Sequence, residues 1–305
     1  MISMSSLFED LKEGLEEAIS FEKGDGEAKT KMYMIMPVKE KKVYKYKEIE
    51  FKVLKKKLEL PVRYVEKVNE NWKREMNAGK SYTNGKLYTM AAVNVLEDKI
   101  RVYVQETNFA HYLYSRSIGI DENSCRSMAA NALLVTSDDY IVLGKMSGST
   151  SLANRVKFIG GAFDQTDFCN EIVDIKNCIT REVKEEVGLN LNDKETVTDV
   201  RPIAILTREK FSFANTLFLV DISLDKSELE RRFTDYKQGL EAAGEKSELS
   251  ELIYIGNNYT SILKFFQDEN NLVIDYMHDF FDAYFGKIEY GNIQEYIVNN
   301  LPEMT

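Results

Sequence analysis

The sequence predicts an α/β protein, and three observations support that class. Residues 175–187 carry helical periodicity between a good N-cap residue, Asp174, and a stop at Gly188. Strand-like runs lie on both sides of this helix, at 132–145 and at 216–222. The content of hydrophobic residues, 44%, is enough for a substantial core. Strands and helices therefore alternate along the chain, as they do in layered α/β domains.

The remaining elements follow from the same signals of periodicity and turn chemistry. In chain order, we predict an acidic helix at 5–21, a strand at 49–53, a helix at 61–78, a hairpin at 87–104 turning at 97–99, a hairpin at 132–145 with a Ser-Asp-Asp turn, the helix at 175–187, strands at 202–206, 216–222 and 252–255, and an acidic helical segment from 261. The last segment is rich in Phe and Tyr. An aromatic stripe at helical spacing is usually core or a dimer contact, so we expect one of these roles.

The helix at 175–187 has an unusual distribution of charge. At about 100° per residue, Glu182 and Glu186 fall inside the apolar arc formed by Ile175, Cys178, Ile179 and Val183. With Glu185, we predict that three carboxylates share one helical face. Glutamates on a helix are usually solvated, but carboxylates on a core-facing arc need cations, because burying an unpaired charge costs several kcal/mol. Mg²⁺ or Mn²⁺, which prefer hard oxygen ligands, would supply that charge.

The segment Arg181 to Leu189, Arg-Glu-Val-Lys-Glu-Glu-Val-Gly-Leu, resembles the second half of the Nudix box, Gly-x5-Glu-x7-Arg-Glu-U-x-Glu-Glu-x-Gly-U, where U is aliphatic. All nine positions fit. Counting back from the arginine puts Val173 at the position of the first glutamate of the box, and Gly161 lies six residues too far upstream. The segment 162–172 therefore carries an insertion, and either Glu171 or Asp164 is a candidate for the missing carboxylate.

The resemblance implies a Nudix α/β/α sandwich with a mixed sheet, preceded by an α+β N-terminal extension. It assigns the extension to 1–115, with an arm at 1–40, and the Nudix domain with its helical C-terminal segment to 116–305. It further implies metal-dependent hydrolysis of a diphosphate, with Mg²⁺ or Mn²⁺ as the cofactor.

The resemblance also implies roles for individual residues, which we give as expectations. The metal ligands would be Glu182, Glu186, Glu185 and the backbone of Gly161, with Glu185 alternatively orienting a water and Arg181 as a structural partner. The general base would be Glu251, or else Glu248. The phosphate would be contacted by Arg155, Lys157 and Arg208, which would otherwise be ordinary surface charges. Glu251 is preferred as the base because it directly precedes the strand-like run Leu-Ile-Tyr-Ile.

Two further segments, 84–88 and 107–112, are loosely similar to a Nudix subgroup that includes UDP-sugar diphosphatases. We therefore expect the substrate to be a nucleoside diphosphate linked to another moiety, such as a nucleotide-sugar or an ADP-ribose-like compound. Hydrolysis of nucleoside triphosphates is the second choice.

Composition limits the class of protein and its partners. No apolar run is long enough to span a bilayer, and the N-terminus does not read as a signal peptide, so we expect a cytoplasmic protein without membrane contact. A net charge of −10 makes nucleic acid an unlikely partner. Three cysteines and two histidines, without paired spacing, favour neither disulfides nor structural zinc. A homodimer is possible on this evidence.

A second class of function stays open at this point. Val173 and the insertion in the box would also suit a Nudix-fold protein that binds a nucleotide and acts as a regulator or interaction protein without catalysis. Other Nudix chemistry, such as isomerisation, is a further alternative.

Overall fold

The structure is a computed structural model that describes residues 43–44, 48–80, 82–96, 99–119, 121–148, 153–163, 165–169, 172–207, 213–274, 276–288 and 296–297. The arm at 1–40, with its predicted acidic helix at 5–21, lies outside the described residues. Residues Met36–Thr305 form one compact unit, and the description below concerns that unit.

The larger sheet has eight strands in the order β1-β11-β12-β5-β6-β13, with β7 paired to β6 and β8 paired to β5. The strands are β1 (Val43–Tyr44), β5 (Ser127–Val135), β6 (Tyr140–Met146), β7 (Val156–Lys157), β8 (Ile159–Ala162), β11 (Val197–Thr207), β12 (Phe213–Ile222) and β13 (Leu249–Gly256). β12 and β5 are parallel, whereas the other pairs are antiparallel. The predicted α/β class with a mixed sheet is confirmed.

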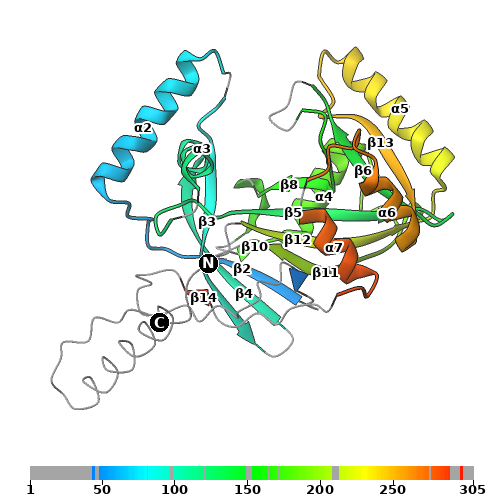
Figure 1. Ribbon diagram of the computed structural model, residues 1–305, viewed down its shortest axis with the longest axis horizontal. Coiled ribbons are helices and arrows are strands. Elements are labelled where there is room, and N and C mark those ends of the chain that lie inside the picture. The colour runs from blue at the N-terminus through cyan, green and yellow to red at the C-terminus, as the bar shows by residue number, and fades with distance from the viewer. Residues whose placement is uncertain are drawn as a thin grey trace. The chain divides into compact units, whose positions relative to one another are not determined.

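Helices cover both faces of this sheet, as Figure 1 shows, and the alternation of side chains along the strands explains why. On β5, Ala132 and Leu134 belong to a core with α4 (Ile175–Val187) and α5 (Lys226–Ala242). Leu133 and Val135, on the opposite face, belong to a core with α6 (Tyr259–Gln267) and α7 (Tyr276–Tyr284). The result is the predicted α/β/α arrangement of layers.

The aromatic C-terminal segment forms part of this second core. Phe280 and Phe281 are fully buried, and their ring centroids lie 5.2 and 5.8 Å from that of Phe158. The core role expected for the aromatic stripe is therefore confirmed for these side chains.

The smaller sheet has six strands in the order β14-β3-β4-β2-β10-β9. Its strands are β2 (Glu48–Val53), β3 (Lys86–Leu96), β4 (Lys99–Asn108), β9 (Phe168–Cys169), β10 (Ile172–Val173) and β14 (Tyr296–Ile297). The helices α2 (Val62–Asn77) and α3 (Phe109–Ile118) pack on each other through Tyr64, Val68 and Ala110. The predicted strand at 49–53, helix at 61–78 and hairpin at 87–104 are all observed.

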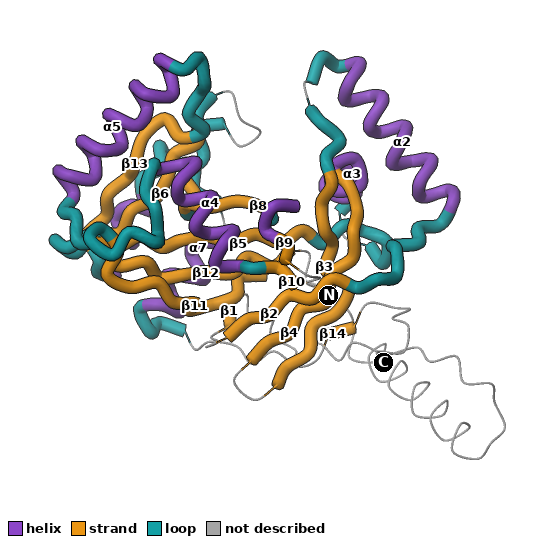
Figure 2. The backbone as a smooth tube through the Cα atoms, turned by 180° about the vertical axis from the view of Figure 1, so that it is seen from behind, coloured by secondary structure: helices purple, strands orange, loops and turns teal. Residues whose placement is uncertain are grey.

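Strands from both sides of residue 115 contribute to each sheet. β1 pairs with β11 in the larger sheet, whereas β10, from the inserted segment of the box, pairs with β2 in the smaller sheet at Ile172↔Lys52 and Val173↔Phe51. Figure 2 shows β10 and β9 beside β2. The extension and the region of the box are thus joined by main-chain hydrogen bonds in addition to side-chain contacts.

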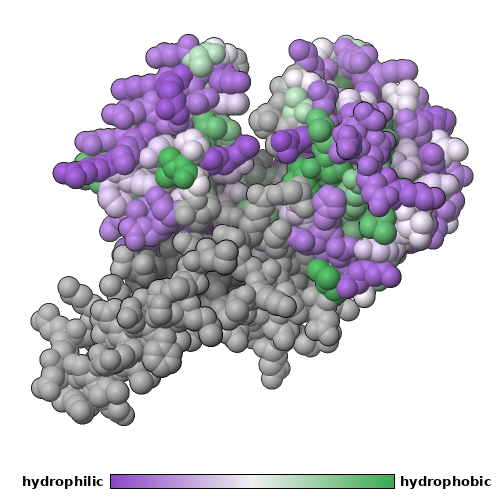
Figure 3. Space-filling model, viewed as in Figure 1, coloured by the Kyte–Doolittle hydropathy of each residue, from purple (hydrophilic) through white to green (hydrophobic). Residues whose placement is uncertain are grey.

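The outer surfaces of α2 and α5 are hydrophilic (Figure 3). On α5, Arg231 pairs with Glu228 and Asp235 at 2.9 and 2.8 Å; Arg231 and Asp235 are largely exposed, and Glu228 is about one third exposed. None of the described helices combines the length and apolar character needed to cross a lipid bilayer.

Gly160 on β8 occupies a position that only glycine tolerates. Its φ is +139°, and a Cβ at this position would overlap the carbonyl oxygen of Ala130 and lie 2.7 Å from the Cα of Asn131. Since β8 pairs with β5 at Asn131↔Gly160, the absent side chain lets the two strands approach each other.

We expect Gly160→Ala to lower the free energy of unfolding by about 3 kcal/mol or more, from backbone strain and overpacking together. Urea denaturation of the full chain measures this value. The control is Gly239→Ala in α5, where a Cβ would meet nothing within 4 Å. Because alanine is the better helix former, that variant should gain about 0.5–1 kcal/mol. Equal stability of the two variants would contradict the assignment of Gly160 as a close-approach position.

Candidate functional site

The helix of the candidate site, α4, has the predicted boundaries and both predicted ends. The Asp174 side chain accepts a hydrogen bond from the Asn177 amide, and Gly188 ends the helix with φ 79°. Glu182 and Glu186 are buried on the core side, as predicted. The prediction that Glu185 shares this face is wrong, because its side chain is 58% exposed. Glu185 lies at the margin of the arc, where Arg181 pairs with it at the surface.

Glu186 is held in the interior by one cation and one amide. Its side chain is 1% exposed; Lys157 Nζ lies 2.7 Å from one carboxylate oxygen, and the Gly160 N–H donates to the other at 2.8 Å. Burial raises the pKa of Glu186, although the Lys157 ammonium and these hydrogen bonds lower it. Lys157, itself 11% exposed, also donates to the Gly160 carbonyl, so it ties the glutamate to the glycine pair.

Glu182 lies directly against the second glycine of the pair. A Cβ on Gly161 would overlap the Glu182 carboxylate, so this glycine leaves room for the acid. Burial raises the pKa of Glu182 to about 7, against the lowering effect of Arg181, whose Nη1 lies 2.8 Å from Glu182 Oε1. A further positive charge nearby would therefore stabilise the ionised form of Glu182.

Arg181 joins three acids at the start of the motif. Its guanidinium contacts Asp167 twice, at 2.8 Å through Nη2 and at 3.3 Å through Nε. Its Nη1 contacts Glu182 and also Glu185, at 3.0 Å. Two parallel bonds to a fully buried carboxylate fix the plane of the guanidinium, which is the geometry of a positioning residue.

Asp167 is the residue that the sequence analysis missed. It stands six positions after Gly161, at the spacing of the first acid of the box, so the insertion follows it and occupies 168–173. That insertion forms the β9–β10 hairpin of the smaller sheet, in which Val173 pairs with Phe51. Counting forward from the glycine instead of back from the arginine would have found Asp167. The earlier candidates, Glu171 and Asp164, lie outside the described residues.

The two candidates for a general base differ in their surroundings. Glu251 is about half exposed and pairs with Lys145 on the neighbouring strand β6 at 2.7 Å. Glu248 lies just before β13, and its negative charge contributes to the raised pKa of Glu186. Glu251 is thus engaged in a surface ion pair, whereas the charge of Glu248 acts on Glu186.

A cavity of about 530 Å³ adjoins the glycine pair. Two of the predicted phosphate-contacting residues, Arg155 and Lys157, line it, together with Gly160 and Gly161. The third, Arg208, lies outside the described residues. Glu182 and Glu186 do not line this cavity, but Lys157 and the glycine pair, which lie against these carboxylates, do.

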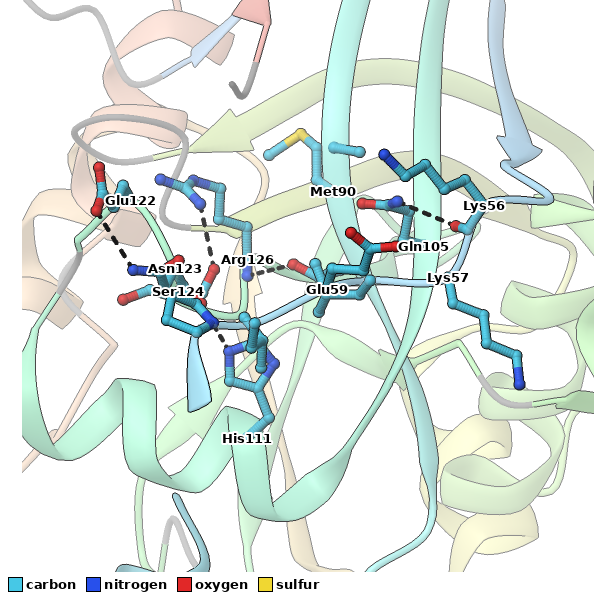
Figure 4. A pocket seen from close by; sticks show the side chains of 15 residues that line it. Lys56, Lys57, Glu59, Met90, Gln105, His111, Glu122, Asn123, Ser124 and Arg126 are labelled. Carbon is cyan, nitrogen blue, oxygen red and sulfur yellow. Dashed lines mark hydrogen bonds between the residues drawn. The ribbon is translucent and has the colours of Figure 1, made fainter. Parts of the chain in front are cut away.

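A second cavity, of about 410 Å³, is lined by residues of the extension and by residues 122–124 and 126, and is drawn in Figure 4. Its buried polar side chains bond to the chain itself: His111 contacts Thr107 at 2.7 Å and the Asn123 carbonyl at 2.8 Å, and Arg126 donates to the Ser124 carbonyl. Desolvation lowers the pKa of His111. These interactions hold the loop before β5 in place and give His111 and Arg126 structural roles.

The donor set around the glycine pair fits a magnesium-like ion in part. The described residues contain no cluster of three or more acids, cysteines or histidines suited to a metal. Mg²⁺, however, usually takes one or two carboxylates and completes its shell with water and phosphate oxygens. Glu182 and Glu186 are two buried carboxylates with raised pKa values, and they meet that smaller requirement.

Comparisons with known proteins give structural matches only. No family model matches the chain, and no curated protein matches it. Among solved structures, it is similar to a bifunctional NMN adenylyltransferase/ADP ribose pyrophosphatase from Francisella tularensis complexed with AMP and a Mn ion, at 10% identity and a TM-score of 0.34, over 53% of this chain and 42% of that one. The chain thus spans less than half of that protein.

Two shorter proteins are matched over nearly their whole length. The MutT protein from Methanosarcina mazei Go1 is 16% identical, with a TM-score of 0.33 over 53% of this chain and 94% of that one. The NUDIX domain of Shewanella oneidensis NrtR, complexed with ADP ribose, is 10% identical, with a TM-score of 0.35 over 57% and 97%. Several of the similar solved structures are named as Nudix proteins, the family that the sequence motif resembles.

We expect Asp167→Ala to lower the free energy of unfolding by about 3 kcal/mol, because it breaks a buried ion pair and leaves Arg181 without its best-aligned partner. The control is Asp235→Ala, which removes an exposed ion pair on α5 and should cost at most about 0.5 kcal/mol. Chemical denaturation of both variants measures the difference. Similar losses in the two would show that Asp167 does not position Arg181.

We expect Lys157→Met to destabilise the metal-free protein by about 3 kcal/mol near pH 8, because the Glu186 charge then stays buried without its cation. The loss should be smaller at pH 5. A carboxyl group whose pKa is raised by folding stabilises the folded state fully below its unfolded-state pKa. This stabilisation is lost as the pH rises through the folded-state pKa. Removing Lys157 raises the folded-state pKa of Glu186 further.

Adding Glu186→Gln to Lys157→Met should recover part of the loss at pH 8. Unfolding of the four proteins in EDTA gives the coupling between the two residues. Additive effects of the two substitutions at both pH values would argue against the pair.

Proposed function

We propose that this protein belongs to the Nudix superfamily and hydrolyses a nucleoside diphosphate linked to a second moiety, with Mg²⁺ or Mn²⁺ as cofactor. The observation that carries the proposal is the pair of buried glutamates, Glu182 and Glu186, packed under Gly160 and Gly161 at the edge of a cavity of about 530 Å³. Buried carboxylates with raised pKa values are costly in a purely structural role, which makes them candidates for function.

The residues of the cavity supply charge for a diphosphate. Lys157 would contact phosphate oxygens from the floor beside the glycine pair, and Arg155, which is exposed, would contact them from the rim. Arg181 acts indirectly, since its bonds to Asp167, Glu182 and Glu185 fix the last turns of α4. A divalent ion, held by Glu182 and Glu186, would neutralise charge that develops on the phosphoryl oxygens.

In this proposal, Glu248 takes a proton from the attacking water. The water oxygen forms a bond to phosphorus, and the bond from phosphorus to the bridging oxygen breaks, so the second phosphate leaves with that oxygen. Glu251 remains paired with Lys145 and stays outside the reaction.

A second candidate function is supported by one observation, the Lys157–Glu186 ion pair. An internal ammonium at 2.7 Å already satisfies the charge of Glu186, as expected for a protein that binds a nucleotide without turning it over. In that case, Lys157 would keep its position when ligand binds, and the protein would act as a regulator.

The first test separates the two functions. The full chain is incubated with Mn²⁺ or Mg²⁺ and UDP-sugars, ADP-ribose, dinucleotides or nucleoside triphosphates, and the released products are quantified. We expect turnover of a linked diphosphate that EDTA abolishes and that Glu186→Gln lowers by at least about a hundredfold. Millimolar Mn²⁺ should also raise the melting temperature of the wild type more than that of Glu186→Gln. Nucleotide binding with no turnover of any compound would support the regulator.

The second test assigns the base. Glu248→Gln should lower kcat by about a hundredfold or more with little change in KM, since its carboxylate takes a proton only in the chemical step. Glu251→Gln, three residues further on in β13, should retain kcat within about twofold, because this carboxylate only forms a surface ion pair. The opposite ranking of the two variants would move the base to Glu251.

A further inference from the structure

Two segments of the extension meet at one wall of the cavity beside the glycine pair. The Asn84 side chain accepts a hydrogen bond from the Ala110 amide at 2.8 Å, and the Gly85 carbonyl accepts one from the Phe109 amide at 3.0 Å. β3 and β4 continue this pairing at Leu87↔Thr107. The start of β3 and the first turn of α3 therefore form a single, hydrogen-bonded surface.

This surface presents aromatic rings to the cavity. Tyr82, Phe109 and Tyr112 all line it and are only half-buried. The ring centroid of Phe109 lies 5.5 Å from that of Tyr82 and 5.6 Å from that of Tyr112, in tilted arrangements. The guanidinium of Arg116 lies 5.7 Å from the Tyr112 ring and also lines the cavity. Because these rings line the cavity and are not fully covered by protein, part of each ring is accessible from the cavity.

The cavity is also lined by a buried hydrogen-bond donor. Asn131 on β5 is 5% exposed, and its Nδ2 has no hydrogen-bond partner among the residues that the structure describes. It lines the same cavity and is the register partner of Gly160. The strand around it is apolar, with Ala130 and Ala132 as its neighbours, so nothing local accounts for an amide here. An unsatisfied buried amide is costly, and a ligand oxygen would satisfy it.

We propose that the cavity binds a nucleoside phosphate in one direction, with the base on the aromatic surface of α3 and the phosphate end at the glycine pair. Tyr82, Phe109 and Tyr112 stack with the base, and Asn131 donates to an oxygen of the sugar or phosphate. Base stacking tolerates any nucleobase, because every base has a π face. This inference rests on the proposed function for the location of the phosphate end, and it makes the N-terminal extension the part that recognises the nucleoside.

The test is isothermal titration of the full chain, in Mn²⁺, with three probes: a nucleoside 5′-monophosphate, ribose 5-phosphate and inorganic phosphate. None of these contains a diphosphate bond, so no turnover interferes. We expect the wild type to bind the monophosphate at least about tenfold more tightly than ribose 5-phosphate. In Phe109→Leu and in Tyr112→Leu, most of the preference for the monophosphate over ribose 5-phosphate should disappear. The affinity of both variants for ribose 5-phosphate should stay at the wild-type value.

Two further variants separate recognition from folding. Asn131→Leu should bind both sugar phosphates at least about tenfold more weakly while its melting temperature does not fall, because an apolar side chain of similar volume replaces an unsatisfied amide. Tyr259→Leu, a ring outside the cavity on α6, should leave all affinities unchanged.

The inference is overturned if the wild type binds the monophosphate no better than ribose 5-phosphate, if it binds none of the probes at millimolar concentration, or if the aromatic variants keep the preference for the base. Its failure is distinct from failure of the proposed function. Base-dependent binding without hydrolysis of any diphosphate would refute only the hydrolase, and hydrolysis that survives both aromatic substitutions unchanged would refute only the aromatic surface.

Discussion

The need to balance buried negative charge governs the structure around α4. Asp167, Glu182 and Glu186 all lie in the interior, and the protein places Arg181 and Lys157 among them. Each cation also contacts the backbone of the glycine-containing strand, at the Ala162 and Gly160 carbonyls. The strand, the helix and the two cations therefore hold one another in position, and a change in any of them leaves a charge without its partner.

The same network explains how the chain accommodates an insertion inside its central motif. The inserted residues lie between Asp167 and Asp174. The backbones of these two residues are joined by a hydrogen bond from the Asp174 amide to the Asp167 carbonyl at 2.8 Å. Because the chain departs and returns at nearly the same place, the Arg181–Asp167 contact survives. The inserted hairpin then adds two strands to the smaller sheet.

Local signals in the sequence predicted the elements that they encode directly. The helix at 175–187 has a side-chain cap, a glycine stop and a clear apolar arc, and the hairpins at 87–104 and 132–145 have alternating strands around polar turns. The burial of Glu182 and Glu186 followed from the arc alone. The exposure of Glu185 did not follow from it, because the angular position of a residue on a helix does not show which side chains pair with it. Arg181 pairs with Glu185 at the surface. Long-range pairings were also out of reach, since the partner of Arg181 and the strand partners of 172–173 depend on tertiary structure.

The exchange of strands between the two sheets bears on how the protein is made. During synthesis, β2 emerges from the ribosome long before residues 172–173, and β1 long before β11 at Val197–Thr207. The edge of β2 that faces β10 and the edge of β1 that faces β11 have no partner until these later segments are synthesised. Backbone donors and acceptors along these edges therefore stay unpaired until the later segments are synthesised. Pairings between segments distant in sequence also form slowly. During that time, the unpaired strand edges are sites at which another nascent chain can pair, so the incomplete sheets need protection from aggregation.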